Sequence, residues 1–145
     1  AIGQGNTQMT PLHNAMITAA IANGGTLMKP YLIDHVESAA GEKVKKFLPS
    51  AYGNLMTAQE ASTLSMFMRS VVTDGTGVRT DAYSVAGKTG SAEFETGKET
   101  HAWFTGFAPA EDPKLVVTVL VEEAGSGGHV AAPIAKSIFD TYFSR

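Results

Sequence analysis

The run Leu115-Val116-Val117-Thr118-Val119-Leu120-Val121 decides the fold class of this chain. It is almost continuously apolar. A strand with one wet face would alternate apolar and polar residues, whereas a continuously apolar strand is typically covered on both faces. The run therefore predicts a strand in a sheet that has helices packed on it.

Two other β-rich runs precede this strand, at Tyr83 to Ala92 and at His101 to Ala108. Segments that are charged or rich in turn-forming residues separate the three runs. Three antiparallel strands in chain order are the simplest arrangement.

Two helices are expected before the strands. Thr10-Pro11 is a good helix start, because Thr can cap free N–H groups and Pro fits the first helical position, and Gly24-Gly25 supplies the stop. The first helix is therefore predicted at about 11 to 23. Thr57-Ala58-Gln59-Glu60 has the spacing of a capping box and opens a second helix, which should end near Asp74-Gly75-Thr76-Gly77.

A peripheral hairpin is expected between these helices. Its arms are Thr26 to Val36, which Pro30 interrupts, and Lys43 to Phe47, with a turn at Ala40-Gly41-Glu42. After Gly125-Ser126-Gly127-Gly128 a last helix is expected to pack back on the sheet. Its apolar stripe is Ala131, Ile134, Ala135, Ile138, Phe139 and Tyr142. The predicted fold class is α/β of the α+β type: an antiparallel sheet with packed helices.

Composition narrows the range of functions. The chain has 145 residues, of which 43% are hydrophobic and 17% charged, as expected for one globular domain or part of one. A net charge of −3, with no basic run longer than Lys45-Lys46, argues against nucleic-acid partners. The absence of cysteine excludes disulfides, thiol catalysis and Cys-ligated zinc. Because there is no initiator Met, signal peptide or long apolar run, we expect the chain to come from a longer protein.

Several residues that could carry chemistry are better explained as structural. The four histidines lack ligand spacing, so no metal or other cofactor is expected. Glu93, Glu95 and Glu122-Glu123 are interpreted as solvated charges at strand ends, Trp103-Phe104 as core, and Gly125 to Gly128 as a plain turn. The histidines are His13, His35, His101 and His129.

Lys88-Thr89-Gly90-Ser91 is the most informative stretch for function. It places an ammonium, two hydroxyls and a glycine on a predicted strand. The lysine can hold a substrate carboxylate or bias a proton transfer, the hydroxyls can donate to the same carboxylate, and Gly90 lets a substrate backbone lie close. A backbone N–H here could also stabilise an oxyanion. The alternative is an edge strand kept soluble by Lys and Thr.

Other motifs accompany this stretch in a fixed order. With them the chain resembles the C-terminal half of the transpeptidase domain of class B, high-molecular-weight penicillin-binding proteins, whose fold is shared with serine β-lactamases. The resemblance covers nearly the whole chain. The motifs are Gly3-Gln4-Gly5, Thr10-Pro11-Leu12, Ala22-Asn23-Gly24-Gly25, Gly75-Thr76-Gly77, Ala86 to Ala92, Trp103 to Pro109 and Ala131-Ala132-Pro133.

The resemblance implies a role for each matching residue. Lys88 would face the acylated serine and support its proton relay. Thr89 and Ser91 would bind the terminal carboxylate of the substrate, and the backbone N–H of Ser91 would complete the oxyanion hole. Gly90 would give clearance, and the Gly75-Thr76-Gly77 loop would lie near the cleft.

The chain also departs from the family pattern. It has neither Ser-x-x-Lys, which holds the nucleophile and its lysine, nor Ser-x-Asn. Thr26-Leu27-Met28-Lys29 lies on a predicted strand, where that spacing points the two end side chains to opposite faces. Tyr52-Gly53-Asn54 resembles the second motif but stands in the wrong order. We therefore expect residues 1–145 to form a partial transpeptidase domain without a nucleophile, inactive by itself.

For the parent protein the resemblance implies a peptidoglycan D,D-transpeptidase that cross-links the cell wall, maintains cell shape and binds β-lactam antibiotics, with a bearing on antibiotic resistance. Its partners would be the missing N-terminal half of the domain and a stem peptide ending in D-Ala-D-Ala. The parent would be anchored by an N-terminal helix at the extracytoplasmic face of the bacterial membrane. Two alternatives remain: a non-catalytic peptide-binding module that lost the nucleophile, and a β-lactamase or D,D-carboxypeptidase relative.

Overall fold

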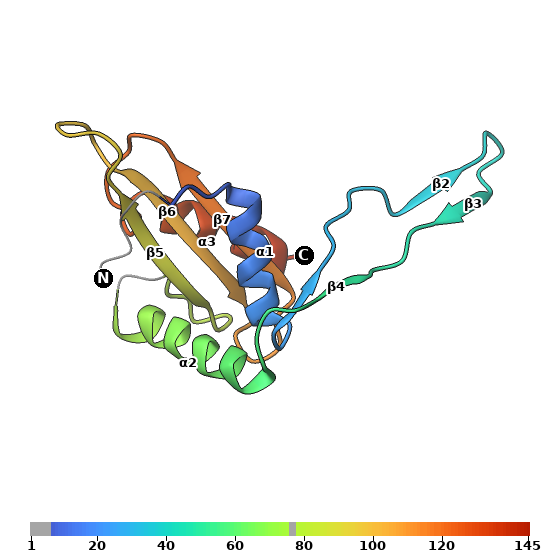
Figure 1. The fold of residues 1–145 in the computed structure, drawn as a ribbon, viewed down its shortest axis with the longest axis horizontal. Helices are drawn as coiled ribbons and strands as arrows, with labels where there is room; N and C mark the ends of the chain where they lie inside the picture. The colour runs from blue at the N-terminus through green and yellow to red at the C-terminus, as the bar shows by residue number, and fades with distance from the viewer. Residues whose placement is uncertain (1–6, 76–77) are drawn as a thin grey trace.

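The computed structural model describes residues 7–75 and 78–145. Helices cover both faces of a central sheet, and a long arm extends from one end of it (Figure 1). The elements in chain order are α1 (Pro11–Ala22), β1 (Thr26–Met28), β2 (His35–Glu37), β3 (Lys43–Lys46), β4 (Ala51–Asn54), α2 (Ala58–Asp74), β5 (Ala86–Ala92), β6 (His101–Ala108), β7 (Leu115–Val121) and α3 (Ala131–Phe143).

The central sheet has three antiparallel strands in the order β5-β6-β7, which confirms the expected pairing of neighbours along the chain. The register is unbroken: Gly90 lies opposite Trp103 in the first pair of strands, and Thr105 lies opposite Thr118 in the second. The predicted bounds of β6 and β7 are those observed. β5 begins three residues later than predicted, at Ala86.

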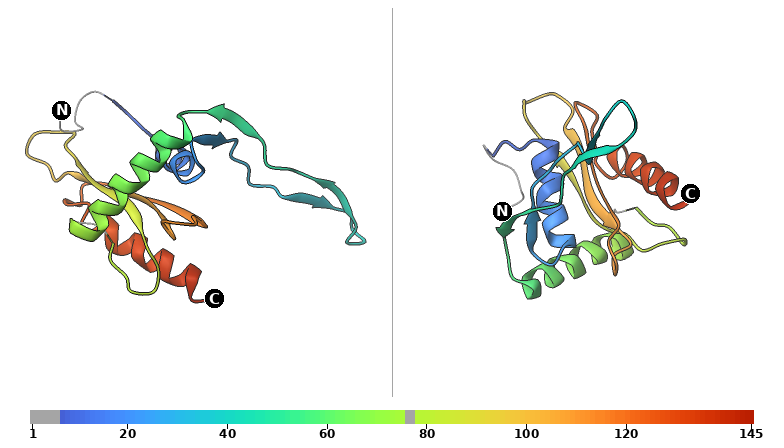
Figure 2. Two further views of the ribbon diagram at one scale, coloured as in Figure 1. Left: turned by 90° about the horizontal axis from the view of Figure 1, so that it is seen from below. Right: turned by 90° about the vertical axis from the view of Figure 1, so that its right-hand side faces the viewer.

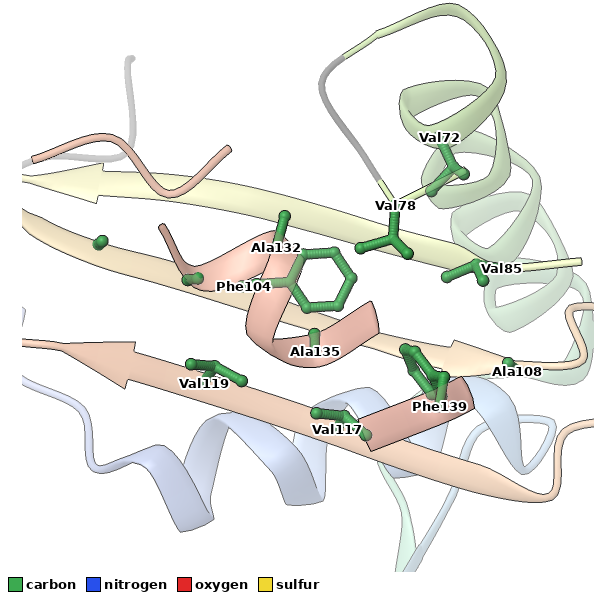
Figure 3. Close-up of a cluster of buried hydrophobic side chains, with 12 residues drawn as sticks. Val72, Val78, Val85, Phe104, Ala108, Val117, Val119, Ala132, Ala135 and Phe139 are labelled. Carbon is green, nitrogen blue, oxygen red and sulfur yellow. The ribbon is translucent and has the colours of Figure 1, made fainter. Parts of the chain in front are cut away.

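Both faces of β7 are covered, as its apolar sequence predicts. Figure 2 shows α1 and α3 on opposite sides of the sheet, and each of them contacts both β6 and β7. On the α3 side, Phe104 and Phe139 are completely buried between helix and strands, together with Val117 and Val119 (Figure 3). This layer is the hydrophobic core of the chain.

The α1 side is held by hydroxyl groups as well as by apolar contact. Thr18, which is buried, donates its hydroxyl proton to the Asn14 carbonyl oxygen at 2.9 Å. Its oxygen lies 2.7 Å from the Thr105 hydroxyl, which lies 2.7 Å from that of Thr118. A chain of three threonine hydroxyls therefore links α1 to β6 and β7.

The helix starts are as predicted. Thr10 accepts the N–H of His13 at 3.1 Å before α1. Thr57 and Glu60 satisfy each other's backbone N–H groups in the predicted capping box of α2. Within the described ranges, no helix has both the length and the apolar character that crossing a membrane requires.

The prediction of a single hairpin between the helices was incomplete. β2 and β3 pair as expected, but β1 pairs with β4, a strand that we did not predict. Pro30 separates β1 from β2, since it has no N–H to give to a ladder. The result is an arm made of two short ribbons, which projects away from the central sheet in Figures 1 and 2.

The predicted apolar stripe of α3 is only half buried, so that prediction was partly wrong. Ala131, Ala135 and Phe139 are buried, but Ile134 and Ile138 are each 43% exposed. The stripe is wider than the contact with the sheet, because the three-stranded sheet does not reach beneath the outer half of the helix. Within β7 only Val117 and Val119 are buried, and the other residues of the strand are half-buried.

Candidate functional site

The Lys88-Thr89-Gly90-Ser91 stretch lies on β5, as predicted. Among the described residues β5 pairs only with β6, so one edge of the strand has no strand beside it. An edge strand presents alternate backbone N–H and C=O groups outward. The stretch therefore combines exposed side chains with a backbone that can accept an additional strand.

The side chains of the stretch divide between two faces. Thr89 and Ser91 lie on the same face as the buried residues opposite them, Phe104 and Ala102. The structure thus brings together the two hydroxyls that were predicted to share a carboxylate. Ser91 is exposed and Thr89 is half-buried.

Lys88 lies on the other face of β5, opposite Thr105. Its side chain is exposed, and its Nζ donates to the carbonyl oxygen of the neighbouring Thr89 at 2.6 Å. The ammonium therefore lies over the strand's own backbone, close to the edge of the sheet. A substrate carboxylate or a serine hydroxyl at this edge would meet an ammonium group on a flexible four-carbon side chain.

The glycines of β5 allow close contacts on both sides. A Cβ on Gly90 would lie 3.3 Å from the Cβ of Trp103, so even a methyl group would press on the opposite residue. A Cβ on Gly87 would lie 2.6 Å from Cζ of Phe104. Sequence reasoning gave no role to Gly87, whose missing side chain leaves room for the buried Phe104 ring.

The loop between β7 and α3 also reaches β5, which the interpretation of Gly125 to Gly128 as a plain turn missed. The N–H of Gly127 donates to the Ser91 Oγ at 3.2 Å. A Cβ on Gly127 would lie 2.2 Å from the Gly90 carbonyl oxygen and 2.3 Å from that of Trp103. Glycine richness alone gave no signal of this contact, because it is equally typical of a free turn.

The loop between β5 and β6 is tied to the same region. The rings of Phe94 and His101 stack with their centroids 4.1 Å apart. Nδ1 of His101 accepts the N–H of Glu123 at 3.0 Å, and Lys98 bridges Glu95 and Glu123. The two loops beyond the end of β5 are therefore joined to each other.

Of the other predicted site residues, the structure describes only Gly75. Gly75 ends α2, where a Cβ would lie 2.7 Å from the Val71 carbonyl oxygen. Thr76, Gly77 and the Gly3-Gln4-Gly5 motif lie outside the described residues.

Neither of the two imperfect motifs lies near β5. Thr26 belongs to β1, where its hydroxyl donates to the Asn54 side chain at 3.1 Å instead of facing Lys29. Tyr52-Gly53-Asn54 lies on β4, in the arm and away from β5 (Figure 1).

The shifted pKa values belong to contacts that support the fold. The hydrogen bond from Lys136, and then that from Tyr83, lowers the pKa of Asp140. A hydrogen bond from Ser84 lowers the pKa of Glu111, and burial raises the pKa of Tyr83. In the part of the chain that the structure describes, no group of three metal-ligating side chains is close enough to hold an ion.

The arrangement on β5 can therefore bind an anionic group and align an extended peptide. Hydroxyls, an ammonium and the backbone N–H groups of an edge strand are the appropriate donors for a peptide that ends in a carboxylate.

A family model and relatives of known name match this chain over nearly its whole length. A family model described as the penicillin binding protein transpeptidase domain matches residues 1–140. The peptidoglycan D,D-transpeptidase MrdA of Haemophilus influenzae is 36% identical over 165 aligned positions, which cover 99% of this chain and 25% of that protein. The peptidoglycan D,D-transpeptidase PbpA of Mycolicibacterium smegmatis is 37% identical, with 94% of this chain and 30% of that protein covered.

Among solved structures, the ceftriaxone acyl-enzyme complex of penicillin-binding protein A from M. tuberculosis superimposes with a TM-score of 0.90 at 34% identity. The match covers 96% of this chain and 33% of that one. The chain thus spans a quarter to a third of the length of these relatives.

Proposed function

Because this chain belongs to the penicillin-binding protein transpeptidase family, we propose that it is the part of a peptidoglycan D,D-transpeptidase that carries the Lys-Thr-Gly wall of the active site. The observation that carries the proposal is the pair of hydroxyls, Thr89 and Ser91, on one face of a strand that has no second strand beside it in the described part of the chain. Relatives named peptidoglycan D,D-transpeptidases support the reaction class.

Each residue of the stretch has a proposed role in this reaction. Thr89 and Ser91 bind the terminal carboxylate of a D-Ala-D-Ala stem peptide, and Gly90 gives the peptide room against the strand. The backbone N–H of Ser91 stabilises the oxyanion, for which a preorganised backbone donor is well suited. Lys88 supports the proton relay of the serine, and the Gly75-Thr76-Gly77 loop borders the cleft.

The serine itself must come from polypeptide outside these 145 residues, because no Ser-x-x-Lys occurs in them. The surface supports such a partner. β7 has a free outer edge in the described part of the chain, and an apolar groove lies on each side of that edge. Leu115, Ile134, Ile138 and Tyr142 line one groove. Met16, Met28 and Val116 line the other.

We place the parent protein at the extracytoplasmic face of the membrane, held there by an N-terminal helix, because its substrate is the cell wall. β-Lactams would acylate the same serine that the stem peptide acylates. The solved structure of the M. tuberculosis relative is a ceftriaxone acyl-enzyme complex.

Mass spectrometry with benzylpenicillin tests the proposal. The 145-residue chain should keep its mass, whereas the longer polypeptide that carries its upstream sequence should gain the mass of the drug. In that polypeptide Lys88→Ala should slow acylation by about 100-fold, in the range of a positioned proton-transfer group. Lys114→Ala, which removes an exposed lysine at the β6–β7 turn, should leave the rate unchanged.

Three outcomes would contradict the proposal. A covalent adduct on the 145 residues alone would show that they contain the nucleophile. Equal acylation of the wild-type and Lys88→Ala polypeptides would remove the role of Lys88. Reversible binding without any adduct would support a non-catalytic peptide-binding module instead.

A further inference from the structure

We infer that Gly127 is a positioning residue of this site: its backbone N–H orients the Ser91 hydroxyl so that the hydroxyl proton points to the carboxylate of the ligand. The inference rests on the proposed function and extends it to the loop between β7 and α3. It starts from the hydrogen bond of 3.2 Å between the Gly127 N–H and the Ser91 Oγ.

Gly127 lies directly on the backbone of the sheet. It is buried, and it packs against the backbone of Gly90 and Trp103, which lie opposite each other in the sheet. Any Cβ at this position would overlap the carbonyl oxygens of both residues, at 2.2 and 2.3 Å. Since those oxygens are backbone atoms of a paired sheet, they cannot rotate away. Only glycine lets the loop come close enough to reach Ser91.

The loop is also fixed from the side away from β5. The Gly127 carbonyl oxygen accepts the N–H of Ala132, a buried residue in the first turn of α3, at 2.9 Å. Two residues earlier, the Gly125 N–H donates to the Thr100 carbonyl oxygen at 2.9 Å, and the Thr100 hydroxyl donates to the Gly125 oxygen at 2.7 Å. The Gly127 N–H is therefore held in place before any ligand binds, which is the condition for a preorganised donor.

The chemistry of a hydroxyl group sets the consequence. A serine hydroxyl has one proton to donate and two lone pairs to accept with. The Gly127 N–H occupies one lone pair, so the proton of Ser91 points away from the loop. Ser91 is exposed, and its proton meets no acceptor within residues 7–75 and 78–145. A donor on the oxygen also polarises the O–H bond and strengthens it as a donor. A ligand with a negatively charged carboxylate gains most from this arrangement.

The test compares two ligands, one with a carboxylate and one in which it is esterified: benzylpenicillin and its methyl ester. Both are measured by the rate at which they acylate the longer polypeptide. Gly127→Ala should lower the rate with benzylpenicillin by roughly tenfold to a hundredfold, the range expected for loss of one hydrogen bond to a charged group. The rate with the methyl ester should change by less than about threefold, since the ester presents no full charge to the hydroxyl. Ser126→Ala, at an exposed position of the same loop, should leave both rates unchanged.

A second measurement does not depend on whether Gly127→Ala folds. Ser91→Ala removes the acceptor and should speed hydrogen exchange of the Gly127 amide, whereas Ser91→Thr keeps a hydroxyl and should preserve both the protection and the preference for the carboxylate.

Equal loss of rate with the two ligands would overturn the inference, because it would mean that Gly127 only supports the fold. Unchanged exchange at Gly127 in Ser91→Ala would also overturn it. If the wild-type polypeptide reacts with neither ligand, the proposed function itself is wrong and the inference falls with it.

Discussion

The central sheet and the arm are both made of antiparallel strands, yet only the sheet has a core. β6 and β7 lie between two helices, and Phe104, Phe107 and Phe139 are completely buried there. In the arm every residue of β3 and β4 is exposed, and Leu32, in the connection between β1 and β2, is fully accessible. The same kind of backbone ladder is therefore supported by side-chain packing in one region and by little beyond its own hydrogen bonds in the other.

The registers reflect this difference. The pairs β5–β6 and β6–β7 run without a break, whereas β1–β4 shifts between Leu27 and Met28, and β2–β3 shifts between Val36 and Glu37. A buried face fixes register, because a slip of one residue would turn the apolar side chains outward. The arm has no such constraint. Two-stranded ribbons of this kind are marginally stable by themselves, so the sheet must provide the rigidity that a binding site needs.

The largest expected effect is the loss of a core ring. Phe139→Ala should lower the free energy of unfolding by about 3–5 kcal/mol, because it removes a fully buried side chain and leaves a cavity between α3 and the sheet. Leu48→Ala in the arm, where the side chain is 74% exposed, should change it by less than about 0.5 kcal/mol. Urea unfolding followed by circular dichroism measures both. Similar losses for the two variants would mean that the arm is packed against something in solution.

A smaller effect is expected at the α1 side of the sheet. Thr18→Val keeps the shape of the side chain but breaks the hydroxyl chain to Thr105, and should cost about 1–2 kcal/mol, since the half-buried hydroxyls of Thr105 and Thr118 lose this partner. Thr141→Val removes the same type of bond, a hydroxyl donating to the carbonyl four residues earlier, at an exposed site on α3. It should cost less than about 0.5 kcal/mol. If the two variants were equally stable, the hydroxyl chain would contribute nothing to the packing of α1.

The sequence was most informative where one physical signal acted alone. The continuous apolar run gave the bounds of β7, and the capping box gave the start of α2, since each depends on neighbours in the chain. β4 was missed because Ala51–Asn54 carries no apolar pattern, and only its pairing with β1 makes it a strand. The exposed half of α3 was missed because periodicity reports an apolar face but not the width of the sheet beneath it.

Part of the candidate site could likewise be predicted from local sequence, and part could not. The hydroxyls of Thr89 and Ser91 could be placed on a common face from strand alternation alone. The contact between Gly127 and Ser91 joins residues 36 positions apart, and no local pattern predicts it. The empty space that Gly127 and Gly87 provide is a property of the packed sheet, which becomes visible only when the opposing carbonyl oxygens and the Phe104 ring are in place.

Lowering the pH should reduce the stability of the central sheet and the helix α3 that packs on it. The pKa of Asp140 is lowered, first by its hydrogen bond from Lys136 and then by that from Tyr83. A lowered pKa in the folded state contributes stability that is present above the unfolded value near 3.8 and is lost as the pH falls below it. The difference in unfolding free energy between wild type and Asp140→Asn should therefore shrink between pH 5 and about pH 2. A difference that stays constant over this range would exclude the carboxylate as its source.

The smallest expected effect lies in the arm. There a rise in pH, instead of a fall, should reduce stability. His35 lies 2.8 Å from Asp34 and 2.8 Å from Glu37, and its hydrogen bond with Asp34, followed by that with Glu37, raises its pKa. Lys46 on β3 lies opposite His35. A raised pKa contributes stability that is fully present below the unfolded value of 6.5 and is lost as the pH rises through the higher folded value.

Raising the pH from 6 to 9 should therefore open the β2–β3 ribbon while the central sheet stays closed. Amide exchange, corrected for its intrinsic dependence on pH, should increase at Val36 and Lys45 and remain constant in β6. His35→Gln should remove the dependence on pH, because glutamine can still donate one hydrogen bond but does not titrate. The β2–β3 ribbon has no hydrophobic core, so losing the hydrogen bonds between one histidine ring and two carboxylates should be enough to change how often the ribbon opens. In the central sheet, side-chain packing would keep the strands paired after an equal loss. Exchange that rises equally in β6 would show instead that the arm and the sheet unfold together.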